Sequence, residues 1–309
     1  MPTEPLESIL YREFSKVQAK EILNSASPLL LELVNYSTNA LARCATSPSG
    51  EVDVDLSILA LYRHIIEITD GIEVLVSQCC AEAATPLLRS SFEDLIYVEY
   101  ILEKDKTGNY IDFSRRSLSW LLSHIHNRLD LFDRFDISTQ KGTEAKKLFD
   151  DDIVFSTIEL PPLDIGKARE NLLKVLAKPH LMPIEKEYQE CKKLRKPNWY
   201  SLFDGPRDLR KLAEYLKRGA HYEILYRPWS ITTHAQDFMP FIKNSADGQT
   251  GIGRLRDPET LQQVAGYAAG FILASTRLVL GKFRPNENIK DWYIREVQKN
   301  YRQIFAIPR

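Results

Sequence analysis

Apolar residues recur at helical spacing along most of this 309-residue chain, and this periodicity constrains its fold more than any other feature. Leu29, Leu33 and Leu41, for example, follow one face of a predicted helix, because residues three or four positions apart share a helix face. The sequence contains no Asn-Gly hairpin turn and no sustained alternation of apolar and polar residues. The pattern therefore predicts an all-α protein, folded as a multi-helix bundle with long central helices.

We expect one helical domain over residues 1–309. Two N-terminal helices within 5–45, the second with Pro28 in its opening turn, and a basic C-terminal helix over 288–305 are expected to pack on its core. Pro86 is expected to bend or start a helix, and the Gly-, Asn- and Asp-rich segment 238–258 is expected to be a loop. The longest helices are predicted over residues 56–80, 87–102, 110–135 and 261–280.

Composition indicates a globular protein. Hydrophobic residues make up 44% of the chain and charged residues 27%, a balance that is not typical of disorder. The most apolar stretch, 264–280, is interrupted by Gly, Ser, Thr and Arg277, and the N-terminus lacks the basic region and apolar core of a signal peptide. We therefore expect a cytoplasmic protein that does not enter a membrane.

The cysteines point to reduced thiols. There are four of them, and none forms a CxxC pair: Cys44, Cys79, Cys80 and Cys191. This spacing is neither that of a disulfide framework nor that of a zinc finger. The motifs GxxxxGK[ST], GxGxxG, HExxH and GxSxG, and the calcium-binding EF-hand loop, are also absent from the sequence. We therefore predict no cofactor and no bound metal.

Charge is unevenly distributed although the net charge is only -1. Residues 51–105 contain 12 acidic and 3 basic residues, whereas residues 191–218 contain 9 basic and 3 acidic ones, and residues 277–309 contain 8 basic and 3 acidic ones. Two interpretations remain open. The segments neutralise one another in the fold, or the basic ones present a surface to a polyanion.

The segment from His221 to His234 carries the clearest candidate chemistry. Pro228 suits the first turn of a helix, which would place Arg227 at the helix entrance with Ser230 and His234 on the same face. A guanidinium, a hydroxyl and an imidazole at a helix N-terminus would bind a phosphate and move a proton. Together they predict RNA cleavage without a metal. The alternative is a capped core histidine at His234, with Arg227 solvated or ion-paired.

The same residues resemble a known superfamily. Arg227-x6-His234, late in an all-helical chain, is similar to the Arg-x4–6-His motif of the HEPN superfamily. The stretches 61–64 (LYRH), 86–93 (PLLRSSFE) and 226–234 (YRPWSITTH) resemble a bacterial HEPN-like family of uncharacterised function, and the likeness spans about residues 55–280. It implies a metal-independent, often dimeric ribonuclease of a defence or toxin system, with RNA as substrate and a protein partner or antitoxin. Pro228 stands where active members usually carry a polar residue, which favours the alternative of a non-catalytic module that binds RNA, a nucleotide or a protein.

Arg89 and Glu93 lie four positions apart on a predicted apolar helix, where either charge is costly to bury unpaired. One interpretation is a buried ion pair that sets helix register. The other is functional: Glu93 orients His234 or His221, Arg89 contacts phosphate, and His64 joins this polar centre as a ligand-binding residue. A metal cluster of His64, Glu93, His221 and His234 is a further alternative.

A second basic segment mixes cations with aromatic residues, and its candidate ligand-binding residues are Lys192, Lys193, Arg195, Lys196 and Trp199. Single-stranded RNA suits such a segment, because bases stack on aromatic rings and phosphates pair with cations. The alternative is a solvated helix end whose aromatic residues belong to the core.

Overall fold

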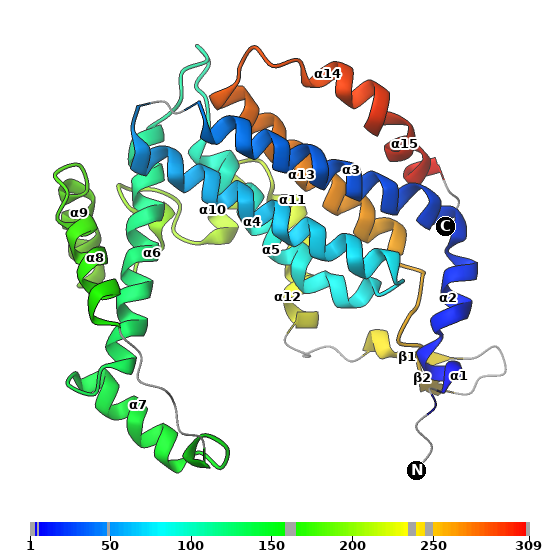
Figure 1. Cartoon of the computed structure of the whole chain (residues 1–309), viewed down its shortest axis with the longest axis horizontal. Helices are drawn as coiled ribbons and strands as arrows, with labels where there is room; N and C mark the ends of the chain where they lie inside the picture. The colour runs from blue at the N-terminus through cyan, green and yellow to red at the C-terminus, as the bar shows by residue number, and fades with distance from the viewer. Residues whose placement is uncertain are drawn as a thin grey trace. The chain divides into compact units, whose positions relative to one another are not determined.

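A computed structural model describes residues 4, 6–47, 50–157, 165–233, 239–244 and 250–306, and most of these residues are helical (Figure 1). The prediction of an all-α multi-helix bundle is confirmed. The chain forms two compact units, unit 1 with residues 1–111 and 209–309 and unit 2 with residues 112–208. The sequence indicated neither boundary, and a single folding domain over 1–309 stays a prediction.

Unit 1 contains the N-terminal and C-terminal helices and a short hairpin. Its elements are α1 (Glu7–Leu10), α2 (Arg12–Gln18), α3 (Lys20–Ala45), α4 (Val52–Ser77), α5 (Ala81–Ile101), α10 (Leu209–Tyr215), α11 (Gly219–His221), the π-helical turn η3 (Tyr222–Tyr226), α12 (Arg227–Thr233), the 3₁₀ turn η4 (Met239–Phe241), β1 (Ile242–Asn244), β2 (Thr250–Ile252), α13 (Leu261–Phe283), α14 (Ile289–Trp292), the π-helical turn η5 (Tyr293–Val297) and α15 (Gln298–Ala306).

The core of unit 1 forms around α13, which packs against α3, α4 and α5 (Figure 1). Ala268, Ile272 and Val279 of α13 are each 0% exposed. By length and composition alone α13 would also suit a membrane span, but 61% of its apolar stretch is buried inside the protein. That burial is typical of the core helix of a globular protein.

Three buried hydroxyl groups connect the central helices. Thr276 Oγ1 of α13 lies 3.0 Å from Ser37 Oγ of α3 and 2.8 Å from Tyr62 Oη of α4. All three residues are at most 1% exposed, and burial raises the pKa of Tyr62, so its hydroxyl stays protonated. Because a buried hydroxyl without a partner is costly, this cluster favours one register of three helices.

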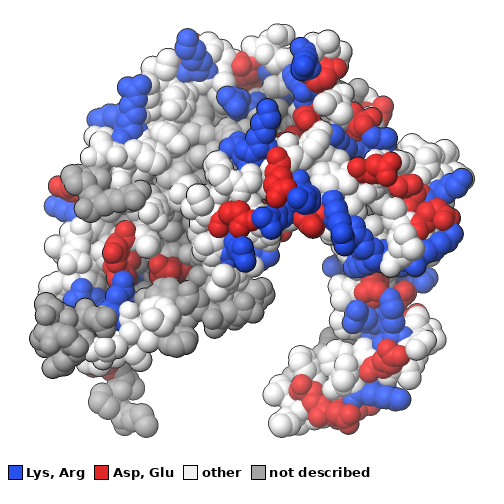
Figure 2. All heavy atoms as spheres, turned by 180° about the vertical axis from the view of Figure 1, so that it is seen from behind, with Lys and Arg blue, Asp and Glu red and all other residues white. Residues whose placement is uncertain are grey.

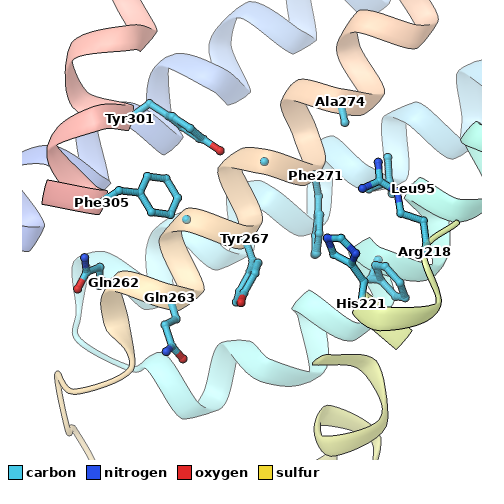
Figure 3. A pocket seen from close by; sticks show the side chains of 13 residues that line it. Leu95, Arg218, His221, Gln262, Gln263, Tyr267, Phe271, Ala274, Tyr301 and Phe305 are labelled. Carbon is cyan, nitrogen blue, oxygen red and sulfur yellow. The ribbon is translucent and has the colours of Figure 1, made fainter. Parts of the chain in front are cut away.

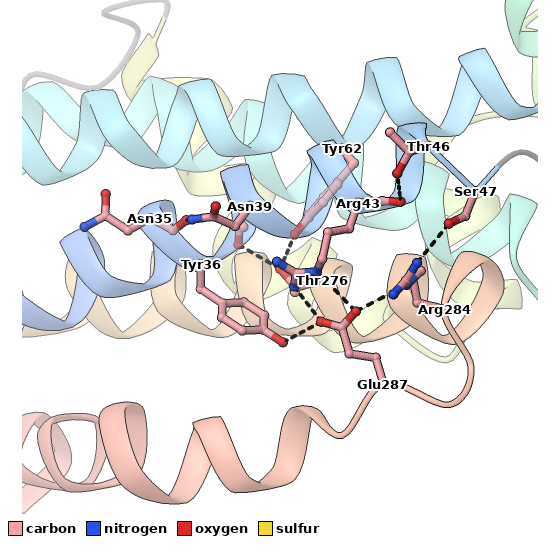
Figure 4. A network of polar contacts seen from close by, with 11 residues as sticks. Asn35, Tyr36, Asn39, Arg43, Thr46, Ser47, Tyr62, Thr276, Arg284 and Glu287 are labelled. Carbon is pink, nitrogen blue, oxygen red and sulfur yellow. Dashed lines mark hydrogen bonds and ion pairs between the residues drawn. The ribbon is translucent and has the colours of Figure 1, made fainter.

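A second polar network, around Glu287, holds the segment that follows α13 (Figure 4). Tyr36 Oη donates to Glu287 at 3.2 Å, Arg43 donates through two nitrogens, and Arg284 lies 3.5 Å away. The bond from Arg43 lowers the pKa of Glu287. Trp292 of α14 then stacks on Tyr36 with ring centres 3.6 Å apart. These contacts, and those of α15 with α3, pack the C-terminal segment on the core.

Several predicted helix boundaries are wrong. Pro28 lies well inside α3 and Pro86 lies inside α5, so neither starts a helix. The N-terminal helix expected before α3 is split at Tyr11, which has a left-handed φ of 60°. Part of the segment expected to be a loop forms the antiparallel pair β1–β2. Helices α3 and α5 continue through their prolines because packing of a long apolar face outweighs one lost backbone hydrogen bond.

Unit 2 is also helical. It contains α6 (Phe113–Phe135), α7 (Gln140–Asp151), the 3₁₀ turn η1 (Phe155–Thr157), α8 (Gly166–Leu176), α9 (Met182–Lys192) and the 3₁₀ turn η2 (Trp199–Ser201). Helix α6 contacts α7, α8, α9 and η2. His126 of α6 pairs with Glu185 of α9 at 2.6 Å and stacks on Tyr188. These contacts place His126 in the packing between two helices.

Replacing the central hydroxyl of the buried cluster is expected to destabilise the protein. Thr276→Val keeps the side-chain shape but removes the hydroxyl that bonds to both Ser37 and Tyr62, which should lower the free energy of unfolding by about 1–3 kcal/mol. Urea denaturation of the full chain, followed by circular dichroism, measures this. Thr69→Val is the matched control: Thr69 is also buried, but among the described residues its hydroxyl bonds to Ile65 O of its own helix and not to another helix. Equal stability losses in the two variants would contradict the proposed role of the cluster.

Candidate functional site

Helix α5 brings together the stretches that the sequence pattern singled out. It packs against α4, which carries His64, and it also contacts η3 and α12, which carry Tyr226 and Arg227. All of these elements belong to unit 1. Residues about 30 and about 135 positions apart therefore meet at one helix.

Arg89, Glu93 and Tyr226 bond to one another. Arg89 Nη2 donates to Tyr226 Oη at 2.9 Å, and Tyr226 Oη donates to Glu93 Oε1 at 2.8 Å. Arg89 Nη2 also lies 3.0 Å from Glu93 Oε1. Burial, and then the bond to Glu93, raises the pKa of Tyr226 to about 12, so the hydroxyl remains a donor at neutral pH. Arg89 and Glu93 therefore form the ion pair of the first interpretation, although their side chains are 26% and 25% exposed rather than fully buried. The pair includes Tyr226, to which the sequence assigned no role.

Arg227 does not lie at the N-terminus of a separate helix, contrary to the prediction. Elements α11, η3 and α12 follow one another without a break, and His221, Tyr222 and Arg227 all have right-handed helical backbone angles. The π-helical turn η3 directly precedes α12, and its wider turn makes room for the Pro228 ring beside the carbonyl of the previous turn. The phosphate cradle expected from a helix N-terminus at Arg227 is therefore not formed.

The Arg227 side chain nevertheless reaches solvent. It is 66% exposed, and its Nη1 donates to Glu223 Oε2 at 3.2 Å, one helical turn earlier. Exposed ion pairs of this kind contribute little to stability, so an anionic ligand would compete with a weakly held carboxylate. Ser230 is half-buried on the same helix. His234 lies outside the described residues, so its predicted position beside Arg227 and Ser230 stays a prediction.

His64 of α4 and Asp94 of α5 form a second polar pair. His64 Nδ1 lies 2.7 Å from Asp94 Oδ2, and the side chains are 54% and 10% exposed. The bond to Asp94 raises the pKa of His64, whereas burial raises the pKa of Asp94. A mostly buried carboxylate thus orients an imidazole that is open to solvent. This is an arrangement suited to proton transfer near neutral pH.

His221 occupies different surroundings. It stacks on Phe92 of α5, with ring centres 6.4 Å apart, and lines a cavity with Arg218 (Figure 3). Burial, and then Arg218, lowers the pKa of His221. Among the described residues no group of three or more His, Cys, Asp or Glu side chains is placed to hold a metal ion. The alternative of a metal cluster that includes His64, Glu93 and His221 gains no support.

The basic segment 192–199 belongs to unit 2 and is largely paired. Lys193 bonds to Glu190 at 2.7 Å, Lys196 bonds to Asn127 at 2.9 Å, and Lys192 lies over the Tyr188 ring. Lys192, Lys193, Arg195 and Lys196 are exposed, but Trp199 is only 7% exposed and packs edge-on against Tyr200. The prediction that Trp199 stacks on an RNA base is therefore wrong. Trp199 belongs to the core, because its buried ring presents no open face to a ligand.

Opposite charges are mixed on the protein surface. On the face shown in Figure 2, Lys and Arg side chains lie interspersed with Asp and Glu side chains. Within unit 1, Arg218 bonds to Glu99 through two nitrogens, at 2.5 and 3.1 Å. Arg218 comes from the basic segment 191–218 and Glu99 from the acidic segment 51–105. This pair supports the interpretation that the two segments neutralise each other in part.

The fold and the site define a helical-bundle protein with exposed histidine and arginine side chains around one helix. Residues 55–249 match DUF5677, a family of unknown function, and the chain belongs to this family. The matched region contains His64, Arg89, Glu93 and Arg227. No curated protein and no solved structure matches the chain.

Two residues of the site were not predicted. Asp94 directly follows Glu93, a candidate site residue, and Tyr226 begins the stretch 226–234 but was given no role of its own. Only the packing of α5 against two different elements reveals that both side chains have polar partners. A search for polar residues on the inner faces of apolar helices would have found Asp94.

We expect the pKa of His64 to lie above 6.5, and Asp94→Asn to lower it, because the bond to the Asp94 carboxylate favours the protonated imidazole. The His64–Asp94 bond should therefore stabilise the fold below pH 6.5, and this contribution should be lost as pH rises through the folded-state pKa of His64. NMR titration of the histidine ring signals measures the pKa of His64 in the wild-type protein and in Asp94→Asn. His221 is the internal control, since its pKa is lowered by burial and by Arg218 and should not respond to Asp94→Asn. A His64 pKa unchanged in Asp94→Asn would contradict the assignment.

Proposed function

We propose that this protein is a HEPN-like, metal-independent endoribonuclease whose site lies where α4, η3 and α12 meet α5. One observation supports this proposal above the others. The three stretches that resemble the HEPN-like family, around His64, Arg89–Glu93 and Tyr226–Arg227, all have side chains bonded to α5 residues or lying on α5 itself. Sequence resemblance and packing thus single out residues on and around the same helix.

The chemistry needs two proton transfers and a cation. The RNA 2′-hydroxyl loses its proton as its oxygen attacks the adjacent phosphorus, and the departing 5′-oxygen takes up a proton as its bond to phosphorus breaks. In this proposal His64, oriented by Asp94, and His234 carry the protons, since imidazoles exchange protons near neutral pH. Arg227 stabilises the charge that builds up on the phosphate oxygens. Ser230 and Arg89 help to position the substrate.

A non-catalytic binding module is the second candidate. It is favoured by the contacts that already engage the polar groups: Arg227 pairs with Glu223, and Arg89 pairs with Glu93 and Tyr226. Such a module would bind RNA with a strong dependence on salt concentration, but it would release no product. Cleavage and binding assays on the same RNA therefore separate the two candidates.

The proposed context follows from the same resemblance. We propose that the protein works in the cytoplasm as a homodimer, in a defence or toxin system with a protein partner or antitoxin. Light scattering on the purified chain tests the dimer. Growth of cells that express wild-type protein or Arg227→Ala tests toxicity.

Replacing Arg227, His64 or His234 by Ala is expected to lower the RNA cleavage rate in EDTA by about 100-fold or more for each variant, because each loses a charge or proton carrier. Gel analysis of a labelled single-stranded RNA measures the rate. Arg134→Ala is the matched control for Arg227→Ala: the two arginine side chains are 60% and 66% exposed, and each pairs with an acidic residue one helical turn earlier, Arg134 with Asp130. Wild-type protein without activity in EDTA, or equal effects of both arginine variants, would contradict the nuclease proposal.

A further inference from the structure

A cavity of about 290 Å³ lies over one face of α13, apart from the His64–Asp94 and Arg89–Glu93–Tyr226 contacts (Figure 3). Gly266, Gly270 and Ala274, one helical turn apart, form its floor. A Cβ atom added at Gly266 would come within 3.0 Å of the Phe305 ring, so α15 covers this face closely there. The missing side chains leave the open space between the helices.

Aromatic rings form the walls of this cavity. Figure 3 shows Tyr301 and Phe305 of α15 on one side of α13, and His221 with Phe271 on the other. His221 and Phe92 are nearly parallel, at 14°, and Tyr267 and Phe271 lie at 24°. These pairs stack on each other within the wall, and the ring surface that the wall presents to the cavity favours an aromatic ligand, because aromatic rings bury much apolar surface on contact and attract one another through their quadrupoles.

Among the residues that the structure describes, the lining of the cavity offers no free positive charge. Arg218 is the cation in its lining, and Glu99 neutralises it through two hydrogen bonds, at 2.5 and 3.1 Å. The remaining polar lining consists of the imidazole of His221, the amides of Gln262 and Gln263, and tyrosine hydroxyls. Burial and Arg218 lower the pKa of His221, which keeps the imidazole neutral at pH 7. Gln262 Nε2 already donates to Ile304 O. The imidazole of His221 and the amide of Gln263 can donate to and accept from a neutral polar ligand, whereas an anion would lose its hydration without gaining a partner charge.

We propose that this cavity is a binding site for an uncharged, planar aromatic or heteroaromatic molecule of one or two rings with an amide-like polar edge. The volume is at the small end of the range for ligand pockets, roughly 300–1,000 Å³, which suits a ligand of this size. The site is independent of the proposed nuclease site, since none of its walls uses His64, Arg89 or Arg227.

The test compares two probes that share the same rings and differ in their polar edge. Indole-3-carboxamide is neutral and planar, and indole-3-carboxylate has the same rings with an anionic edge. Isothermal titration of the full-length protein at pH 7 is expected to show saturable binding of the carboxamide, with an affinity about tenfold or more above that of the carboxylate. No saturable binding of the carboxamide, or equal affinity for the two probes, would overturn the proposal.

Variants locate the binding. Gly270→Leu fills the cavity and should weaken carboxamide binding by about tenfold or more, whereas Gly281→Leu, on the same helix with open space around it, should leave binding unchanged. Circular dichroism checks the fold of each variant. If Gly270→Leu does not fold, Gly270→Ala serves as the cavity variant. Its methyl group would lie at an ordinary contact distance of 3.7 Å from Tyr301 Oη and would still reduce the space in the cavity. A folded cavity variant that binds the carboxamide as well as wild type would overturn the proposal, whatever the RNA cleavage assay shows.

Discussion

The packing of α3, α4 and α5 around α13 is the interaction on which the rest of unit 1 depends. A helix with neighbours on several sides must be apolar over most of its surface, and α13 meets this requirement with Ala268, Ile272 and Val279. Apolar packing alone would tolerate a shift of one helix along another. The buried contacts of Thr276 with Ser37 and Tyr62 make such a shift costly, because it would leave hydroxyl groups without partners.

Side chains on different faces of helix α5 contact different parts of unit 1. Phe92 faces the aromatic cavity, Asp94 holds His64, and Glu93 holds Tyr226. Because consecutive residues of a helix point about 100° apart, three adjacent positions serve three surroundings. The buried side of α5 fixes the helix against α4 and α13, and this rigid support orients polar side chains better than a loop would.

Much of the fold could be predicted from the sequence, because helical periodicity is a local property. Residues such as Leu29 and Leu33 carry the apolar pattern of α3. Such patterns predict both the all-α fold class and the long central helices. The breaks were harder to predict. Proline is a local signal against helix, yet Pro28 and Pro86 lie inside helices whose burial outweighs the lost hydrogen bond. The short β1–β2 pair was also not predicted, since three-residue strands carry almost no periodicity.

The sequence by itself determined the class of fold and drew attention to His64, Arg89, Glu93 and Arg227, because periodicity and charged residues in apolar segments are visible along the chain. Only the tertiary structure decided their partners. It placed Asp94 beside His64 and Tyr226 between Arg89 and Glu93, buried Trp199, and continued the helix through Arg227. Contacts between residues far apart in the sequence depend on which helix faces pack together, and that choice is made by the free energy of the whole core rather than by any local pattern.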